Sequence, residues 1–203
     1  MGSSHSIQLQ EDEIMSIIEE TGFSRNQVIR IYNRFLKLDK NDKGYISEED
    51  FRRIPEFTVN PLCDRLIDIF MRKKVLEDET VADQDGINFR EFINVISTFR
   101  TYDNMESHEC EKNKNKKLKF IFDIYDVSSD NLIDRQDITN ILNLMVGSTL
   151  SNEQFSQIVD RTMAELNMSK DKSEQYNSIN FQDFKKVLET IDLEEKMSVK
   201  FRG

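Results

Sequence analysis

The chain has 203 residues, of which 28 are basic and 38 acidic, giving a formal net charge of −10. Because an acidic surface repels phosphate groups, this charge argues against nucleic acid as a partner and favours calcium or basic protein segments. Two cysteines are too few for a disulfide scaffold, and no run approaches the roughly 20 apolar residues of a membrane span, so we expect a cytosolic protein.

The first predicted unit is an N-terminal segment, residues 1–24, that combines a lipidation motif with an amphipathic helix. Residues 1–6 match the myristoylation pattern, which predicts a myristoyl group on Gly2. One myristoyl chain binds membranes only marginally, with a constant of roughly 10⁴ M⁻¹, and no Lys or Arg precedes Arg25 to attract anionic lipid. The acyl chain therefore either packs into the protein or is joined by a membrane-embedded partner. An apolar helical stripe suits either arrangement and consists of Ile14, Ile17 and Ile18.

An isoleucine followed four residues later by an acid and then by an apolar residue occurs four times along the chain. This is the back half of an EF-hand calcium loop, in which the apolar residue pairs with a sister loop and the final acid grips the ion. Each copy predicts a helix, a loop and a second helix, with a short two-strand contact at the isoleucine. The copies are Ile46/Asp50/Phe51, Ile87/Glu91/Phe92, Ile133/Asp137/Ile138 and Ile179/Asp183/Phe184.

These repeats predict an all-α fold, a two-lobed array of four EF-hand motifs with mostly degenerate loops and short contacts between the loops. We place the N-terminal lobe at residues 25–100 and the C-terminal lobe at residues 117–191, because apolar residues at helical spacing follow every loop. Residues 101–116 are polar and lack this periodicity, so we expect a linker there. Pro55 is expected to end one helix and Pro61 to begin another.

The third loop, Asp126 to Asp137, keeps the residue types that bind a divalent cation. An EF-hand loop presents oxygen at its first, third, fifth, seventh, ninth and twelfth residues, the seventh through its backbone carbonyl. Asn131 replaces the turn glycine and tolerates the left-handed conformation. The twelfth residue is an aspartate, shorter than the preferred glutamate, so we expect one weak calcium site at which magnesium competes. Its predicted ligand residues are Asp126, Ser128, Asp130, Leu132, Asp134 and Asp137.

The first loop, Asp39 to Asp50, begins well but carries one residue of the wrong charge. Asp39 and Asn41 supply oxygens, and Gly44 suits the turn. The fifth residue is Lys43, which puts an ammonium group where an oxygen acceptor belongs. We therefore expect no metal in the first loop.

The second and fourth loops are expected to be structural and free of metal. In the second, counting back from Ile87 puts Thr80 and Ala82 in ligand positions, and the alternative register is one residue too short. In the fourth, Lys172 and Tyr176 stand where oxygen ligands are needed. The isoleucines of these loops still provide the paired strands.

Several specific strings span nearly the whole chain: Glu20-Thr21-Gly22-Phe23-Ser24, Arg53-Ile54-Pro55-Glu56, Asn60-Pro61-Leu62 with Asp64-Arg65, Met145-Val146-Gly147, Asp160-Arg161-Thr162 and Glu195-Lys196-Met197-Ser198. Taken with the repeats, they make the chain resemble the calcineurin B homologous proteins. The resemblance implies a myristoylated regulatory subunit, cytoplasmic and peripheral at the plasma membrane or endomembranes. It also implies that an amphipathic helix from the juxtamembrane tail of a sodium/proton exchanger lies in an apolar groove across both lobes.

The alternative interpretation is a calcineurin B-type protein, a regulator or inhibitor of a protein phosphatase that binds the calcineurin catalytic subunit. Such a regulator resembles a four-calcium protein, which the degenerate loops disfavour. A calcium buffer is disfavoured because at most one loop keeps its ligands, and no nucleophile, base or phosphate loop stands at the spacing an enzyme needs. The tail, residues 192–203, is a candidate lid over the groove and carries Met197, Val199 and Phe201.

Overall fold

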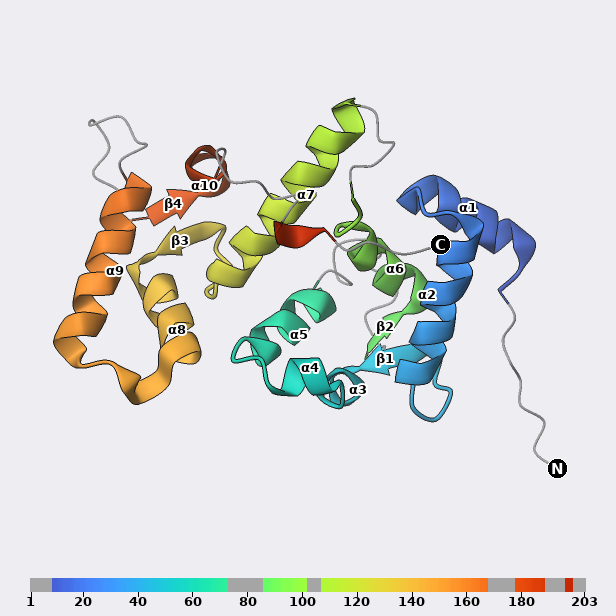
Figure 1. The fold of residues 1–203 in the computed structure, drawn as a ribbon, viewed down its shortest axis with the longest axis horizontal. Coiled ribbons are helices and arrows are strands. Elements are labelled where there is room, and N and C mark those ends of the chain that lie inside the picture. Colours follow the sequence, from blue (N-terminus) through green and yellow to red (C-terminus); the bar gives the residue numbers. More distant parts are fainter. Residues whose placement is uncertain (1–8, 73–85, 102–106, 168–177, 189–195, 199–203) are drawn as a thin grey trace.

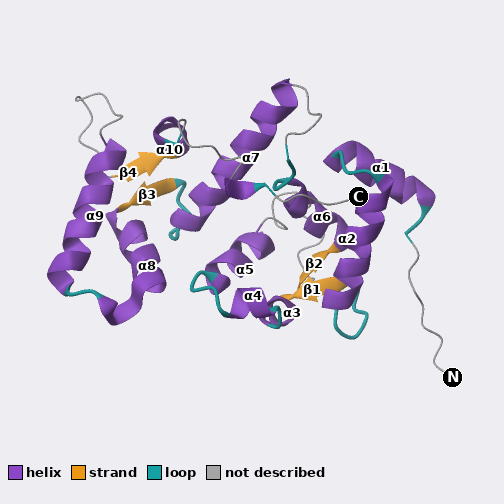
Figure 2. Ribbon diagram, viewed as in Figure 1, coloured by secondary structure: helices purple, strands orange, loops and turns teal. Residues whose placement is uncertain are grey.

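The computed structural model describes residues 9–72, 86–101, 107–167, 178–188 and 196–198. The described residues are mostly helical, with two small antiparallel sheets, as Figure 2 shows. The expectations for Gly2, Thr80, Ala82, Lys172 and Tyr176 fall outside the described residues. Among the helices described, none is both long enough and apolar enough to cross a bilayer.

The first two repeats form an N-terminal lobe and the last two a C-terminal lobe, with α7 between them (Figure 1). The N-terminal elements are α1 (Glu11–Thr21), α2 (Arg25–Leu38), β1 (Tyr45–Ser47), α3 (Glu48–Arg52), α4 (Pro55–Thr58), α5 (Cys63–Arg72), β2 (Gly86–Asn88) and α6 (Phe89–Ser97). The elements that follow are α7 (Ser107–Tyr125), β3 (Leu132–Asp134), α8 (Arg135–Val146), a short 3-10 helix (Gly147–Thr149), α9 (Asn152–Asn167), β4 (Ser178–Asn180) and α10 (Phe181–Val187).

The loops pair through their isoleucines, as predicted. β1 and β2 are antiparallel with Ile46 opposite Ile87, and β3 and β4 are antiparallel with Ile133 opposite Ile179. All four side chains are at most 1% exposed, and full burial of each stabilises the fold by about 1.5–3 kcal/mol. The prediction of an all-α, two-lobed EF-hand array is therefore confirmed.

In the first three loops, the acid that ends the loop also helps to cap the helix that follows it. In the first loop Asp50 is the third residue of α3, and its carboxylate accepts a hydrogen bond from the backbone N–H of Ser47 while the Ser47 side chain accepts one from Asp50. The same reciprocal capping box joins Asn88 to Glu91 and the loop-three pair described below. This arrangement stabilises a helix start without any metal, so the repeated acids have a structural role of their own.

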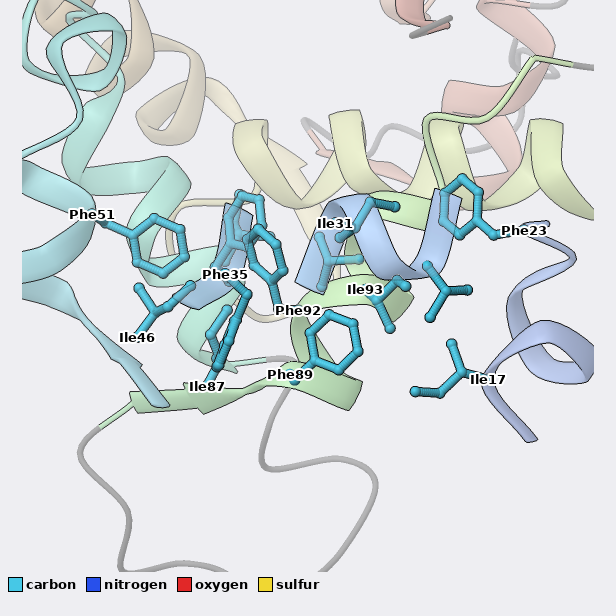
Figure 3. Packing of buried hydrophobic residues seen from close by; sticks show 14 of the residues in the cluster. Ile17, Phe23, Ile31, Phe35, Ile46, Phe51, Ile87, Phe89, Phe92 and Ile93 are labelled. Carbon is cyan, nitrogen blue, oxygen red and sulfur yellow. The ribbon is translucent and has the colours of Figure 1, made fainter. Parts of the chain in front are cut away.

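Buried apolar side chains form one cluster in each lobe. The N-terminal cluster gathers side chains from α1, α2, α5 and α6, with Phe35 between Phe89 and Phe92 in ring contacts (Figure 3). Ile14 and Ile17 of α1 belong to it, so the apolar stripe of the predicted segment 1–24 packs into the lobe. The C-terminal cluster is smaller and consists of Phe122, Ile133, Ile138, Val159, Met163, Ile179 and Phe184.

Helix α7 contributes to both clusters. Phe120 lies in the N-terminal cluster, whereas Phe122 lies in the C-terminal one. The predicted linker, residues 101–116, is helical from Ser107 onward and continues into the same helix. One of its polar residues contacts the N-terminal lobe, since the Asn113 side chain donates to the carbonyl of Ser97 at 3.3 Å. This part of the predicted linker is therefore helical despite its polar composition.

Helix α3 ends at Arg52, before Pro55, as predicted, whereas Pro61 differs from its prediction. Pro55 is the first residue of α4, where its missing N–H leaves no helical hydrogen bond unmade. Helix α5 begins only at Cys63, because residues 61–62 form a turn in which the Asn60 side chain accepts from the N–H of Leu62 at 2.9 Å. Pro61 therefore lies before the helix rather than in its first turn.

Candidate metal centre in the third loop

The third loop has the backbone of a tight turn held by its first residue. Ser129 and Asn131 have positive φ angles of 61° and 64°, which confirms that Asn131 takes the left-handed turn conformation. Asp126 is 5% exposed. Its two carboxylate oxygens accept from the backbone N–H groups of Asp130 at 3.2 Å and Asn131 at 3.1 Å. Asp126 thus orders the front half of the loop.

The last residue of the loop, Asp137, is hydrogen-bonded to backbone groups in the middle of the same loop. Its side chain is almost fully buried, and its two oxygens accept from the N–H groups of Ser128 at 3.0 Å and Asp134 at 3.1 Å. Asp134 returns a bond, accepting from the N–H of Asp137 at 2.9 Å. Burial raises the pKa of Asp137, and the negative charges of Asp134 and Asp126 raise it further. Negative charge therefore gathers here, and a bound cation would relieve the repulsion.

The remaining predicted ligands lie in the same loop. The Ser128 hydroxyl is 3.5 Å from Asp126 Oδ1, and Asp130 Oδ1 accepts from the N–H of Leu132 at 2.9 Å. Among the described residues, no three His, Cys, Asp or Glu side chains gather closely enough to hold a metal ion. The oxygen donors are of the type that hard cations take, so the residues fit calcium or magnesium in kind, and coordination by this set stays a prediction.

A buried arginine joins the third loop to the N-terminal lobe. Arg65 of α5 is 5% exposed, and its Nε donates to the carbonyl of Ile124 at 3.1 Å. Its Nη2 donates to the carbonyls of Asp123 and Asp126. Carbonyls at the end of a helix lack helical partners and attract a cation, so Arg65 caps α7 where the loop begins. Burial lowers the pKa of Arg65, although a guanidinium stays protonated in proteins.

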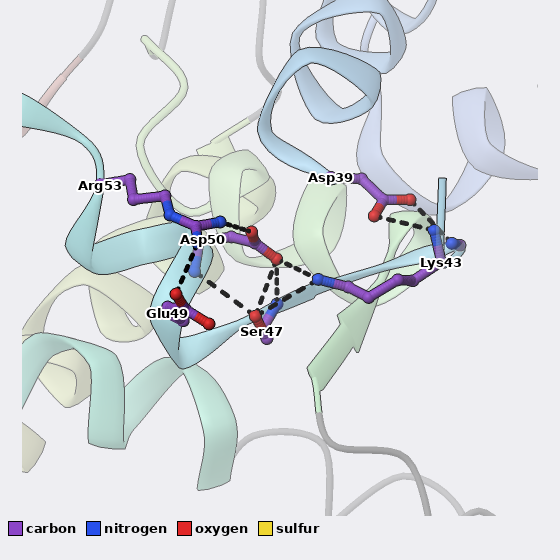
Figure 4. Close-up of polar contacts among 7 residues, drawn as sticks. Asp39, Lys43, Ser47, Glu49, Asp50 and Arg53 are labelled. Atoms are coloured by element: carbon purple, nitrogen blue, oxygen red, sulfur yellow. Dashed lines mark hydrogen bonds and ion pairs between the residues drawn. The ribbon is translucent and has the colours of Figure 1, made fainter. Parts of the chain in front are cut away.

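The first loop has the same backbone hydrogen bonds to its first residue, but the Lys43 side chain points into the loop. Asp39 accepts from the N–H groups of Lys43 at 3.0 Å and Gly44 at 2.7 Å, just as Asp126 does in the third loop. The Lys43 ammonium lies 2.5 Å from an oxygen of Asp50 (Figure 4). The lysine that made the sequence unfit for a metal therefore reaches the acid at the end of its own loop.

Three large exposed apolar side chains lie on the α8–α9 hairpin. Leu144 and Met145 near the end of α8 are 48% and 53% exposed, and Ile158 of α9 is 40% exposed. We call these three the apolar hairpin residues. Large apolar side chains exposed on neighbouring elements are typical of surfaces that bind a partner.

The described part of the tail lies on the N-terminal lobe. Met197 packs against the N-terminal cluster, and Ser198 is 2.5 Å from the fully buried ammonium of Lys117. The Lys117 ammonium also donates to the carbonyl of Arg100 at 3.0 Å. The position of Met197 agrees with an apolar role for this residue, and the action of the tail as a lid stays a prediction.

Comparison with known proteins places the chain in a family. No family model matches the sequence. The calcineurin B subunit of Naegleria gruberi is 36% identical over 193 residues, covering 95% of this chain and 96% of that protein. The type 2 calcineurin B subunit of Dictyostelium discoideum is 38% identical over 88% of this chain and 90% of its own length. Calcineurin B homologous protein 3 of Gallus gallus is 34% identical over 99% of this chain and 95% of its own length. With its paired EF-hand loops and this similarity over nearly its whole length, the chain belongs to the calcineurin B-like family of EF-hand proteins.

Proposed function

We propose that the chain is a non-catalytic regulatory subunit that clamps an amphipathic helix of a partner protein. The observation that carries the proposal is the exposure of the apolar hairpin residues, Leu144, Met145 and Ile158, on adjacent helices. A partner helix with apolar residues on one face would cover these side chains and remove them from water. The net charge of −10 suits basic residues at the flanks of such a helix.

The partner that we propose is the juxtamembrane helix of a membrane transporter, a sodium/proton exchanger. The support is the similarity to calcineurin B homologous protein 3 over 99% of the chain and the strings quoted above. A myristoyl group on Gly2 would bring the protein to the same membrane, and the exchanger would supply the second anchor that a single acyl chain needs. The complex would then sit in the cytoplasm, at the plasma membrane or endomembranes.

Calcium enters the proposal through the third loop. We propose a single weak site in which Asp126, Ser128, Asp130, Asp134 and Asp137 and the carbonyl of Leu132 hold calcium, with magnesium competing. The raised pKa of Asp137 supports it, because burial and the neighbouring charges of Asp134 and Asp126 make its ionised form costly until a cation balances it.

A second candidate function is regulation of a protein phosphatase. It is favoured by the calcineurin B subunits of Naegleria gruberi and Dictyostelium discoideum, which match 95% and 88% of the chain at 36% and 38% identity. The same apolar hairpin residues would then hold a helix of the phosphatase catalytic subunit, and the chain would act either as its regulator or as an inhibitor.

Peptide binding separates the two candidates. One labelled peptide covers the juxtamembrane helix of an exchanger, and another covers the helix through which a phosphatase catalytic subunit holds its regulator. Both are titrated with the full chain, and anisotropy is read with calcium and with a chelator. We expect the exchanger peptide to bind, and Ile158→Glu to weaken it about tenfold, a loss of about 1.4 kcal/mol. The matched control is Ile29→Glu on α2, because Ile29 is 38% exposed and Ile158 is 40% exposed.

The outcomes decide between the functions. Binding of the phosphatase peptide alone selects the second candidate. Failure of both peptides, or an equal effect of Ile29→Glu and Ile158→Glu, would reject the helix-clamping function itself.

A further inference from the structure

The Lys43 ammonium lies inside the first loop rather than in solvent. The side chain is 24% exposed, and that of its partner Asp50 is 1% exposed. Its Nζ lies 2.5 Å from Asp50 Oδ2 and donates to the hydroxyl of Ser47 at 3.4 Å (Figure 4). The contact therefore joins the fifth residue of the loop to its ninth and twelfth residues.

These partners are the oxygens that an EF-hand loop directs at its cation. In a binding loop the ninth residue contributes directly or through water, and the twelfth through its carboxylate. Here Ser47 and Asp50 hold those two positions, and the ammonium contacts both. The first-position acid, Asp39, accepts instead from two backbone N–H groups, which keeps the front of the loop folded around the lysine.

The charge of Asp50 is balanced on both of its oxygens. Oδ2 faces Lys43, and Oδ1 accepts from the Arg53 guanidinium at 3.2 Å. Burial raises the pKa of Asp50, but the hydrogen bonds from Lys43 and Ser47 outweigh burial and the pKa is lowered. A carboxylate buried to this degree needs a paired cation, and the chain itself supplies one.

We propose that the Lys43 ammonium is the resident cation of the first loop, taking the place that a divalent ion takes in a binding EF-hand loop. The residues present do not fit a metal, because a metal would have to share Asp50 and Ser47 with a fixed positive charge. The ammonium then holds β1 and α3 in one arrangement at any calcium concentration. The first loop is then unable to respond to calcium. The proposal concerns the first loop alone and stands whether or not the partner proposed above is correct.

The test uses the full chain with the third loop disabled by Asp126→Ala, so that calcium binding by the third loop does not mask a signal from the first loop. Isothermal titration calorimetry of this variant with calcium chloride should show no saturable binding. Adding Lys43→Asp replaces the ammonium by a carboxylate beside Asp39, Asn41 and Asp50, and should create one saturable site. At calcium about 100-fold above its Kd, the melting temperature of the double variant should rise by roughly 5 °C, whereas Asp126→Ala alone should not shift.

A milder variant keeps the proposal testable if the double variant folds poorly. Lys43→Met in the otherwise unchanged chain should lower the melting temperature in chelator by several degrees. Lys40→Met, in the same loop but at an exposed position, is the matched control and should leave the melting temperature unchanged. Saturable calcium binding by Asp126→Ala with Lys43 intact would overturn the proposal. So would equal melting temperatures of Lys43→Met and Lys40→Met, or a folded double variant that binds no calcium.

Discussion

Arg65 of the N-terminal lobe donates a hydrogen bond to the backbone carbonyl of Asp126, the first residue of the third loop. The two residues are far apart in sequence, and the contact is buried. The same guanidinium binds two further carbonyls at the end of α7. The third loop is therefore joined directly to α5 through the loop's own backbone.

Replacement of Arg65 should destabilise the chain strongly. Arg65→Met keeps an apolar stem but leaves the carbonyls of Asp123, Ile124 and Asp126 without this donor, so we expect the free energy of unfolding to fall by about 2–4 kcal/mol. Urea denaturation followed by circular dichroism measures the loss. Arg72→Met on the same helix removes an exposed ion pair with Asp68 and should cost less than about 1 kcal/mol. Similar losses for the two variants would show that the capping bonds are unimportant.

Lengthening Asp137 should strengthen calcium binding at the third loop. Asp137→Glu restores the side chain that supplies two oxygens at the twelfth position, and we expect calcium affinity to rise roughly tenfold, about 1.4 kcal/mol, with less competition from magnesium. Calorimetry with each ion measures both effects. Asp50→Glu makes the same change in the first loop, where Lys43 is present, and should create no calcium site. Unchanged affinity of Asp137→Glu would count against Asp137 as a ligand.

Truncation of a paired isoleucine should weaken one lobe. Ile179 is fully buried and lies opposite Ile133, so Ile179→Ala removes packed methyl and methylene groups and leaves a cavity. We expect a loss of about 2–5 kcal/mol in the free energy of unfolding, measured by chemical denaturation in chelator. Val59→Ala, at a side chain that is 82% exposed, is the control and should change stability by less than about 0.5 kcal/mol. A tolerated Ile179→Ala would mean that the loop pairing does not hold this lobe together.

Acid should act on the first and third loops in opposite directions. The pKa of Asp50 is lowered in the folded chain, since hydrogen bonds from Lys43 and Ser47 outweigh its burial. Ionised Asp50 therefore stabilises the fold fully above its unfolded pKa of about 3.9, and this contribution is lost as the pH falls through the lower folded pKa. Asp50→Asn should be less stable than the parent chain at pH 7, and the gap should narrow as the pH approaches 3.

The contrasting variant is Asp137→Asn. The pKa of Asp137 is raised, first by burial, so the parent chain gains stability at this residue as the pH falls and the variant does not. The stability of Asp137→Asn relative to the parent chain should therefore decline in acid. Denaturation midpoints measured in chelator between pH 7 and pH 3 report both trends, and parallel trends for the two variants would contradict the opposite pKa shifts.

The repeated pattern was sufficient to predict the paired loops and the two lobes. Ile46, Ile87, Ile133 and Ile179 are local signals, because an apolar residue at fixed distance from a capping acid belongs to one loop and one helix start. The structure confirms these isoleucines at the centre of each sheet. The residue types of the third loop were equally readable, since its donors all lie within one stretch of twelve residues.

Contacts between distant segments were beyond such local reasoning. Arg65 was visible only as part of a string, and its carbonyl partners lie 58 to 61 positions later in the sequence, at the end of α7 and the start of the third loop. The sequence showed that Lys43 makes the first loop unsuitable for a metal ion. It did not show that the ammonium contacts Asp50, because that contact depends on where α3 places the carboxylate. Residues 107–116 read as a linker because their partners, such as the Ser97 carbonyl for Asn113, are not marked by any periodic pattern.

Phe120 and Phe122 of α7 are two positions apart and are buried in different clusters. Two residues along an α-helix rotate the side-chain direction by about 200°. The two rings therefore point in nearly opposite directions from α7, each into the apolar cluster of a different lobe. Rotating α7 about its axis would move both rings out of their clusters at once. The apolar cores of both lobes therefore depend on the orientation of this one helix.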